Sequence, residues 1–146
     1  AYTNYTITRI DNNIVGIKEA SGNIAQIEQI IRLRPAGFKV FSGDDGIALP
    51  LMHSGADGII SVIGNAFAAE FTQMVACALK GDYSQAETID NRLRPMYDLL
   101  FLDGNPAGIK ALLNLRGMAE NVLRLPLVPA TDATVEKISA ALQTII

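Results

Sequence analysis

The chain has 146 residues, of which 49% are hydrophobic and 18% are charged, and its formal net charge is −3. This length and composition predict a folded globular unit and exclude a disordered chain. A small negative charge gives no field for nucleic acid or an anionic membrane, so we expect neither as a partner. The single cysteine, Cys77, excludes a disulfide framework, and no apolar run reaches the roughly 20 residues that span a bilayer. The start of the chain does not have the pattern of a signal peptide, so the cytoplasm is the expected location.

Residues 1–82 alternate short apolar runs with amphipathic segments, which is the pattern of βα units on a parallel sheet. Asn23 is placed to cap the first helix, and Pro35 is placed to end it. Gly81 is placed to stop the last helix of this part. We therefore predict strands over residues 13–18, 38–41 and 59–63, with helices over residues 24–34, 49–52 and 65–80.

From Tyr83 onward the strand signals disappear, and helical periodicity marks residues 84–100, 106–115 and 131–146. Pro106 suits the first turn of its helix. The prolines of the LRLPLVP stretch at residues 123–129 forbid a helix there. The change of pattern predicts a division of the chain into a βα part, residues 1–82, and a helical part, residues 83–146.

Three parallel strands alone would leave two open sheet edges and exposed apolar faces, which folded proteins seldom tolerate. A complete (β/α)8 barrel takes about 250 residues, with active sites at the carboxyl ends of its strands. The chain is therefore expected to be the C-terminal portion of such an α/β barrel, followed by a helical region.

Lys18 ends the first predicted strand, where burial of an unpaired ammonium group would be costly. A desolvated lysine has a lowered pKa, and as a free amine it attacks a ketone to form an imine. The protonated imine acidifies the adjacent carbon of a keto acid such as pyruvate, which gives an enamine able to attack an aldehyde. The spacing alone is equally compatible with a lysine whose ammonium group reaches solvent at the strand end.

The SGDD sequence at residues 42–45 ends the second predicted strand. Gly43 allows the backbone to approach a ligand, and a carboxylate here can cap the following helix. Capping is the favoured interpretation for Asp45. Asp44 is nearer the strand mouth, so it is the one expected to face a ligand.

Other candidate positions have structural explanations of equal or greater weight. A buried strand accounts for residues 58–65, including Ile60, without any chemistry. Asn105 precedes Pro106, and a turn that leads into the following helix explains this pair. A contact of the Asn105 side chain with a ligand explains it equally well. The lone histidine, His53, is expected to have a structural role.

Together these segments resemble the dihydrodipicolinate synthase family of class I, pyruvate-dependent aldolases and lyases. The resemblance is carried by GIKEASGN at residues 16–23, SGDD at residues 42–45 and GIISV at residues 58–62, in the order and spacing of that family. Asn105-Pro106 with Lys110, and LRLPL at residues 123–127, resemble its C-terminal helical region. The resemblance extends from about residue 13 to the end of the chain.

This resemblance implies a homotetrameric (β/α)8 enzyme of which the chain carries about strands 6–8 and the C-terminal helices. It implies condensation of pyruvate with aspartate semialdehyde to 4-hydroxy-tetrahydrodipicolinate, on the route to lysine and diaminopimelate, with neither a metal nor an added cofactor. Lys18 would form the pyruvate imine. Gly43 and the backbone carbonyl of Ile60 would line the pyruvate pocket. Asp44 and Asn105 would lie toward the aldehyde.

Related families offer alternatives to this resemblance, and the chain also lacks parts of the family's active site. The residues EASGN after the lysine favour the synthase over the related N-acetylneuraminate lyase and keto-sugar-acid aldolases. The family's proton-relay tyrosines and carboxylate-binding arginine belong to its first five strands, and the tyrosines of this chain do not occupy the tyrosine motif; they are Tyr2, Tyr5, Tyr83 and Tyr97. The isolated chain is therefore expected to have negligible synthase activity. A non-catalytic half-barrel that associates with itself is the remaining possibility.

Overall fold

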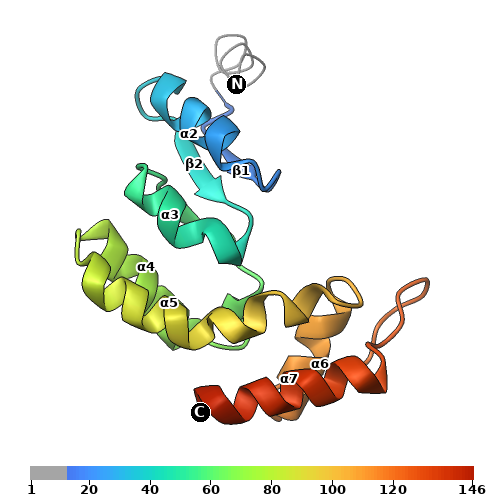
Figure 1. The fold of residues 1–146 in the computed structure, drawn as a ribbon. Coiled ribbons are helices and arrows are strands. Elements are labelled where there is room, and N and C mark those ends of the chain that lie inside the picture. Colours follow the sequence, from blue (N-terminus) through green and yellow to red (C-terminus); the bar gives the residue numbers. More distant parts are fainter. Residues whose placement is uncertain (1–12) are drawn as a thin grey trace.

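The computed structural model describes residues 13–146, so Tyr2 and Tyr5 lie outside the described part. Its three strands, all parallel, form one sheet in the order β1-β2-β3. Their bounds are β1 (Gly16–Glu19), β2 (Lys39–Ser42) and β3 (Gly58–Ile59), with helices α2 (Ile24–Leu33) and α3 (Ala48–His53) between them (Figure 1). The βα pattern expected of the first part of the chain is confirmed.

Local sequence signals account for the bounds of α2. The Asn23 side chain accepts a hydrogen bond from the N–H of Gln26 at 3.1 Å, which makes it the N-cap. Arg34 has an extended backbone conformation and ends the helix, because the following Pro35 disfavours a helical conformation at the residue before it. Ile27 and Ile30 are buried on the inner face of α2.

The strands differ from their predicted bounds, most clearly at the third. Residues 59–63 were expected to form a strand, but β3 ends at Ile59 and a short 3-10 helix, η2 (Ile63–Asn65), follows. The N–H groups of Val62 and Ile63 donate to the Asp45 carboxylate, so they do not extend the strand ladder. The first strand is displaced as well, and covers residues 16–19 instead of 13–18.

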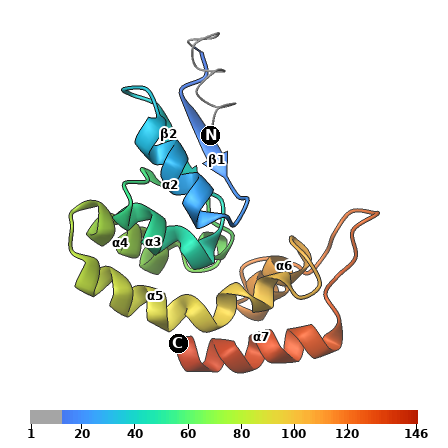
Figure 2. The same cartoon turned by 45° about the horizontal axis from the view of Figure 1, so that its top comes forward.

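The remainder of the described chain contains helices and no strand, as predicted. Its elements are α4 (Ala68–Leu79), α5 (Tyr83–Tyr97), η3 (Leu99–Phe101), α6 (Ala107–Leu115) and α7 (Asp132–Ile145). Thr131 caps α7, and residues 123–129 contain no helix, in agreement with their prolines. Figure 2 shows α5 and α7 lying along the same side of the molecule. Within residues 13–146, no helix combines the length and apolarity that a bilayer crossing requires.

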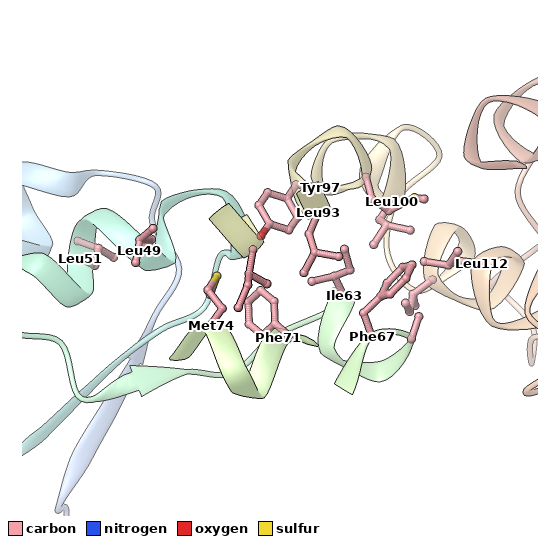
Figure 3. Packing of buried hydrophobic residues seen from close by; sticks show 14 of the residues in the cluster. Leu49, Leu51, Ile63, Phe67, Phe71, Met74, Leu93, Tyr97, Leu100 and Leu112 are labelled. Atoms are coloured by element: carbon pink, nitrogen blue, oxygen red, sulfur yellow. The ribbon is translucent and has the colours of Figure 1, made fainter. Parts of the chain in front are cut away.

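One hydrophobic cluster joins the βα part to the helical part. Figure 3 shows Phe71 of α4 facing Leu93 of α5, with Leu112 of α6 farther along the same core. At the start of α5, the Tyr83 ring stacks on the His53 ring with 3.5 Å between centroids, which gives His53 a packing contact. The cluster crosses the predicted boundary at residues 82 and 83, so the division into two parts stays a prediction.

Candidate active site

Lys18 lies on the face of the sheet that the described helices leave open. In the parallel register it is paired with Phe41, while the next residue, Glu19, is paired with Ser42. Successive strand residues point to opposite faces. Glu19 and Ser42 are buried, whereas Lys18 is exposed. Of the two placements that the strand position left open, burial and exposure to solvent, residues 13–146 show the exposed one, because no described element encloses the Lys18 side chain. The imine-forming role of Lys18 stays a prediction.

Gly43 lies directly against the Lys18 side chain. Its N–H donates a 2.7 Å hydrogen bond to the backbone carbonyl of Glu19, which draws the loop after β2 onto β1. A methyl group at Gly43 would lie 2.8 Å from Cε of Lys18 and 2.6 Å from Cβ of Ala20. These separations are far inside carbon–carbon contact distance. Glycine at this position is what leaves room for the lysine side chain.

Ile60 follows the third strand at the same end of the sheet. Its N–H donates a 2.9 Å hydrogen bond to the backbone carbonyl of Ser42, and its side chain is 49% exposed. The carboxyl ends of parallel strands meet at one edge, so Lys18, Gly43 and Ile60 are arrayed along that edge on successive strands. The role of the Ile60 carbonyl in ligand binding stays a prediction.

Of the two adjacent aspartates, Asp44 makes the helix cap that was expected of Asp45. Asp44 is the residue that caps the 3-10 helix η1 (Asp45–Ile47), because its Oδ1 accepts from the N–H of Gly46 at 2.8 Å. Asp45 is only 3% exposed and does not cap its own helix. Its Oδ2 accepts from the N–H groups of Val62 at 3.1 Å and Ile63 at 2.9 Å. The capping role predicted for Asp45 is therefore wrong, since its side chain crosses to the loop after β3.

A pocket of about 550 Å³ lies beside Gly43, and neither Lys18 nor Ile60 is one of its lining residues. It is lined by Ala20, Gly43, Asp44, Asp45, Tyr97, Asp98, Phe101 and Leu102. The last four come from the end of α5 and from η3 and its flank, which carry no motif that sequence analysis could use. Asp44 thus both caps η1 and faces the pocket. Asn105 is exposed in the loop before α6 and is not one of the lining residues.

The electrostatics of the pocket are set by burial. Burial raises the pKa of Asp45 above its ordinary value, and the Ser61 hydroxyl, followed by the N–H groups of Ile63 and Val62, counteracts this only in part. Burial, together with the negative charge of Asp90, raises the pKa of Tyr97 far above its ordinary value. The Tyr97 hydroxyl donates to Oδ1 of Asp90 at 2.8 Å. Tyr97 is therefore a fixed neutral donor whose hydroxyl is already engaged, although its side chain lines the pocket.

Metal-ligating side chains do not gather in this region or elsewhere in residues 13–146: no group of three or more His, Cys, Asp or Glu residues could hold an ion. The chemistry that the arrangement can support is that of a primary amine. Lys18 is accessible and lies against Gly43, which carries no side chain, and Gly43 in turn lines an acidic pocket.

Comparisons with known proteins agree with this geometry. The model of the dihydrodipicolinate synthetase family matches residues 4–145. The curated 4-hydroxy-tetrahydrodipicolinate synthase of Parabacteroides distasonis is 54% identical over 143 residues, which cover 98% of this chain and 48% of that protein. The crystal structure of dihydrodipicolinate synthase from Thermotoga maritima has a TM-score of 0.93 at 38% identity, and the match covers 97% of this chain and 49% of that one.

A further solved relative, dihydrodipicolinate synthase from Acinetobacter baumannii in complex with pyruvate, has a TM-score of 0.85 at 36% identity. That match covers 91% of this chain and 46% of the relative, so the chain spans about half the length of the proteins it matches. The predicted α/β fold is confirmed, since it matches the barrel structures of these enzymes. On the match of the family model and the identity to its members, this chain belongs to the dihydrodipicolinate synthetase family.

Proposed function

We propose that this chain supplies the imine-forming part of a lyase that condenses pyruvate with aspartate semialdehyde to give 4-hydroxy-tetrahydrodipicolinate. The observation that carries the proposal is the contact of Lys18 with Gly43 at the carboxyl ends of parallel strands. Family membership and the relative in complex with pyruvate support the choice of substrates. The product belongs to lysine and diaminopimelate biosynthesis.

In the proposed reaction the free amine of Lys18 attacks the keto carbon of pyruvate. A C–N bond forms, and the carbonyl oxygen leaves as water. The protonated imine draws electrons from the adjacent methyl group, which loses a proton and becomes an enamine carbon. That carbon then forms the C–C bond to the aldehyde, whose oxygen takes up a proton, and the imine of Lys18 is regenerated. Attack of the amino group of aspartate semialdehyde on this imine carbon closes the ring and breaks the C–N bond to Lys18, which leaves as the free amine. The imine itself is the electron sink, so the reaction is proposed to proceed without a cofactor.

Gly43 and Ile60 are proposed to line the pyruvate pocket, Gly43 by leaving space and Ile60 by its backbone carbonyl oxygen. Neither is proposed to donate an N–H group to pyruvate. Both of their N–H groups are already engaged, with the carbonyls of Glu19 and Ser42. A carboxylate needs a cation or several N–H donors. The side chains that line the pocket in residues 13–146 include no lysine or arginine. We therefore propose that the chain alone has negligible condensation activity.

The aldehyde is proposed to bind on the acidic side of the pocket. Asp44 and Asp98 line that side, and carboxylates suit the ammonium group of aspartate semialdehyde. Asn105 is also proposed to contact the aldehyde, from its exposed loop before α6. We propose further that the chain forms strands 6–8 and the C-terminal helices of a (β/α)8 barrel, in a cytoplasmic homotetramer. The curated relatives carry the synthase name, which favours this substrate over those of N-acetylneuraminate lyase and keto-sugar-acid aldolases.

Reductive trapping tests the central claim. The chain is incubated with pyruvate and cyanoborohydride, and its peptides are mapped by mass spectrometry. We expect Lys18 to carry the reduced pyruvate adduct, and the Lys18→Arg variant to lose it. Lys39, at the amino end of β2 and paired with Asp57, is the internal control and should be labelled more slowly. Equal labelling of the two lysines would refute the assignment of Lys18.

A second measurement addresses the non-catalytic alternative. A half-barrel that only associates with itself would be oligomeric in solution and unlabelled by pyruvate at Lys18. Molecular mass by light scattering, measured beside the trapping, separates that case from an imine-forming chain of any oligomeric state.

A further inference from the structure

We propose that Asp45 is a positioning residue for this reaction: its carboxylate holds the backbone after β3, and with it the Ile60 carbonyl, in place beside Lys18 and Gly43. The inference rests on the proposed function of Lys18. It assigns to Asp45 a role through the backbone, without contact to the substrate.

The carboxylate joins two loops that lie far apart in the sequence. Asp45 begins the turn after β2, and its Oδ2 accepts from the N–H groups of Val62 and Ile63, 17 and 18 residues later. A carboxylate binds N–H groups about twice as strongly as a neutral acceptor does. The side chain is 3% exposed, so water does not compete for these bonds. The two loops are therefore held at a fixed separation.

The same contact completes the tethering of the segment that contains Ile60. At its beginning the Ile60 N–H donates to the carbonyl of Ser42 at 2.9 Å. At its end the N–H groups of Val62 and Ile63 stand at the start of η2, where a helix has no internal acceptor for them. Val62 supplies no side-chain cap of its own. Asp45 supplies that cap, so both ends of residues 60–63 are attached to β2 or to the turn after it.

The adjacent aspartate does not share this function. Oδ1 of Asp44 is occupied by the N–H of Gly46 within its own turn. In Asp45 the second oxygen, Oδ1, is buried and has no hydrogen-bond partner among the described residues. A buried oxygen without a partner lowers stability. The arrangement thus has a cost for folding, and what it provides is a fixed backbone at the end of β3.

The test compares Asp45→Asn with Asp57→Asn in the 146-residue chain. Asparagine has the size of aspartate but no charge. Asp57 is the matched control because its carboxylate, with a side chain 16% exposed, accepts from the N–H of Val40 at 2.9 Å and also bonds to Lys39. It thereby ties the residue before β3 to β2 and, through Arg34, to the end of α2, but at the amino end of the strands, away from Lys18.

Two quantities are measured for each variant: hydrogen exchange of the Val62 and Ile63 amides, and the pyruvate concentration that gives half-maximal trapping at Lys18. We expect Asp45→Asn to accelerate the exchange by about ten- to a hundredfold, as loss of a charge-assisted bond does. The half-maximal pyruvate concentration should rise at least tenfold. Asp57→Asn should lower thermal stability and leave both quantities unchanged.

The inference fails if Asp45→Asn changes neither quantity, or if Asp57→Asn changes both to the same extent. An unlabelled wild-type Lys18 would refute the proposed function instead, and amide exchange would then still decide whether Asp45 holds Val62 and Ile63. If Asp45→Asn does not fold, wild-type exchange decides: these two amides must be protected, and unprotected amides would overturn the role of Asp45.

Discussion

Adding a single methyl group at Gly43 tests whether the lysine contact is functional. In Gly43→Ala the new carbon would meet Cε of Lys18 at 2.8 Å, Cβ of Ala20 at 2.6 Å and the carbonyl oxygen of Glu19 at 3.2 Å. Gly43 is not one of the glycines with a positive φ, so alanine adopts its backbone conformation without strain. Any effect of the substitution therefore comes from lack of space.

The expected effect has two parts of different size. Cε of Lys18 is near the end of a flexible side chain and moves away readily, whereas Cβ of Ala20 and the Glu19 carbonyl move only with the backbone. Overpacking of this kind costs about 1–3 kcal/mol of folding free energy. Displacement of a reacting group by about 1 Å lowers the rate about a hundredfold. We expect trapping of pyruvate at Lys18 to slow by that order, beyond the loss of stability.

Gly46→Ala is the control, because it adds the same methyl group one turn away. Its new carbon would lie 3.4 Å from Oδ1 of Asp44 and 4.0 Å from Cδ2 of Tyr97, which are ordinary contacts. This variant should unfold within about 0.5 kcal/mol of the wild type in urea and keep its trapping rate. Wild-type trapping at Lys18 in Gly43→Ala, with wild-type stability, would show that the close approach has no functional meaning.

Two predictions concern stability. In Gly108→Ala the methyl group would lie 2.2 Å from the backbone carbonyl oxygen of Leu100. The free energy of unfolding in urea should therefore fall by at least about 2 kcal/mol, although glycine to alanine in a helix ordinarily raises it by about 1 kcal/mol. A rise in Gly108→Ala would show that α6 does not pack this closely on η3. Burial raises the pKa of Asp57, but the N–H of Val40, Lys39 and Arg34 together hold it below its ordinary value of 3.8. A carboxyl group whose pKa is lower in the folded than in the unfolded chain stabilises the fold at every pH above its unfolded-state pKa. This stabilisation is therefore present at neutral pH, and it is lost as the pH falls through the pKa of the folded state. Thermal unfolding between pH 6 and pH 2 should show a smaller acid-induced loss in Asp57→Asn than in the wild type, and equal losses would contradict the role of the carboxylate.

Much of the fold could be predicted because its signals are local. The Asn23 side chain caps the first turn of α2, and Pro35 ends the same helix by disfavouring a helical conformation at Arg34. Neither effect depends on distant parts of the chain. The family resemblance implied that Lys18 and Gly43 share one pocket, and parallel strands do bring their carboxyl ends to one edge. Motif order alone was enough to identify the family.

Other features could not be predicted, because they depend on contacts between distant segments. Asp44 and Asp45 are the same residue type in adjacent positions, and only the turn after β2 decides which carboxylate caps η1 and which crosses to Val62. The shortened third strand follows from that same contact. Tyr97 reaches the pocket from α5, more than fifty residues from Gly43, through helix packing that no local pattern records.

Lys18 shows where the boundary between the two kinds of information lies. The sequence by itself determined that an amine stands near the end of one strand and that a glycine follows the next strand, because strand periodicity and turn residues are set by nearby residues. Only the tertiary structure decided that the amine is exposed, that Asp45 secures the neighbouring loop and that an acidic pocket adjoins the site. Burial and hydrogen bonding between loops depend on which surfaces meet, and that is a property of the folded chain as a whole.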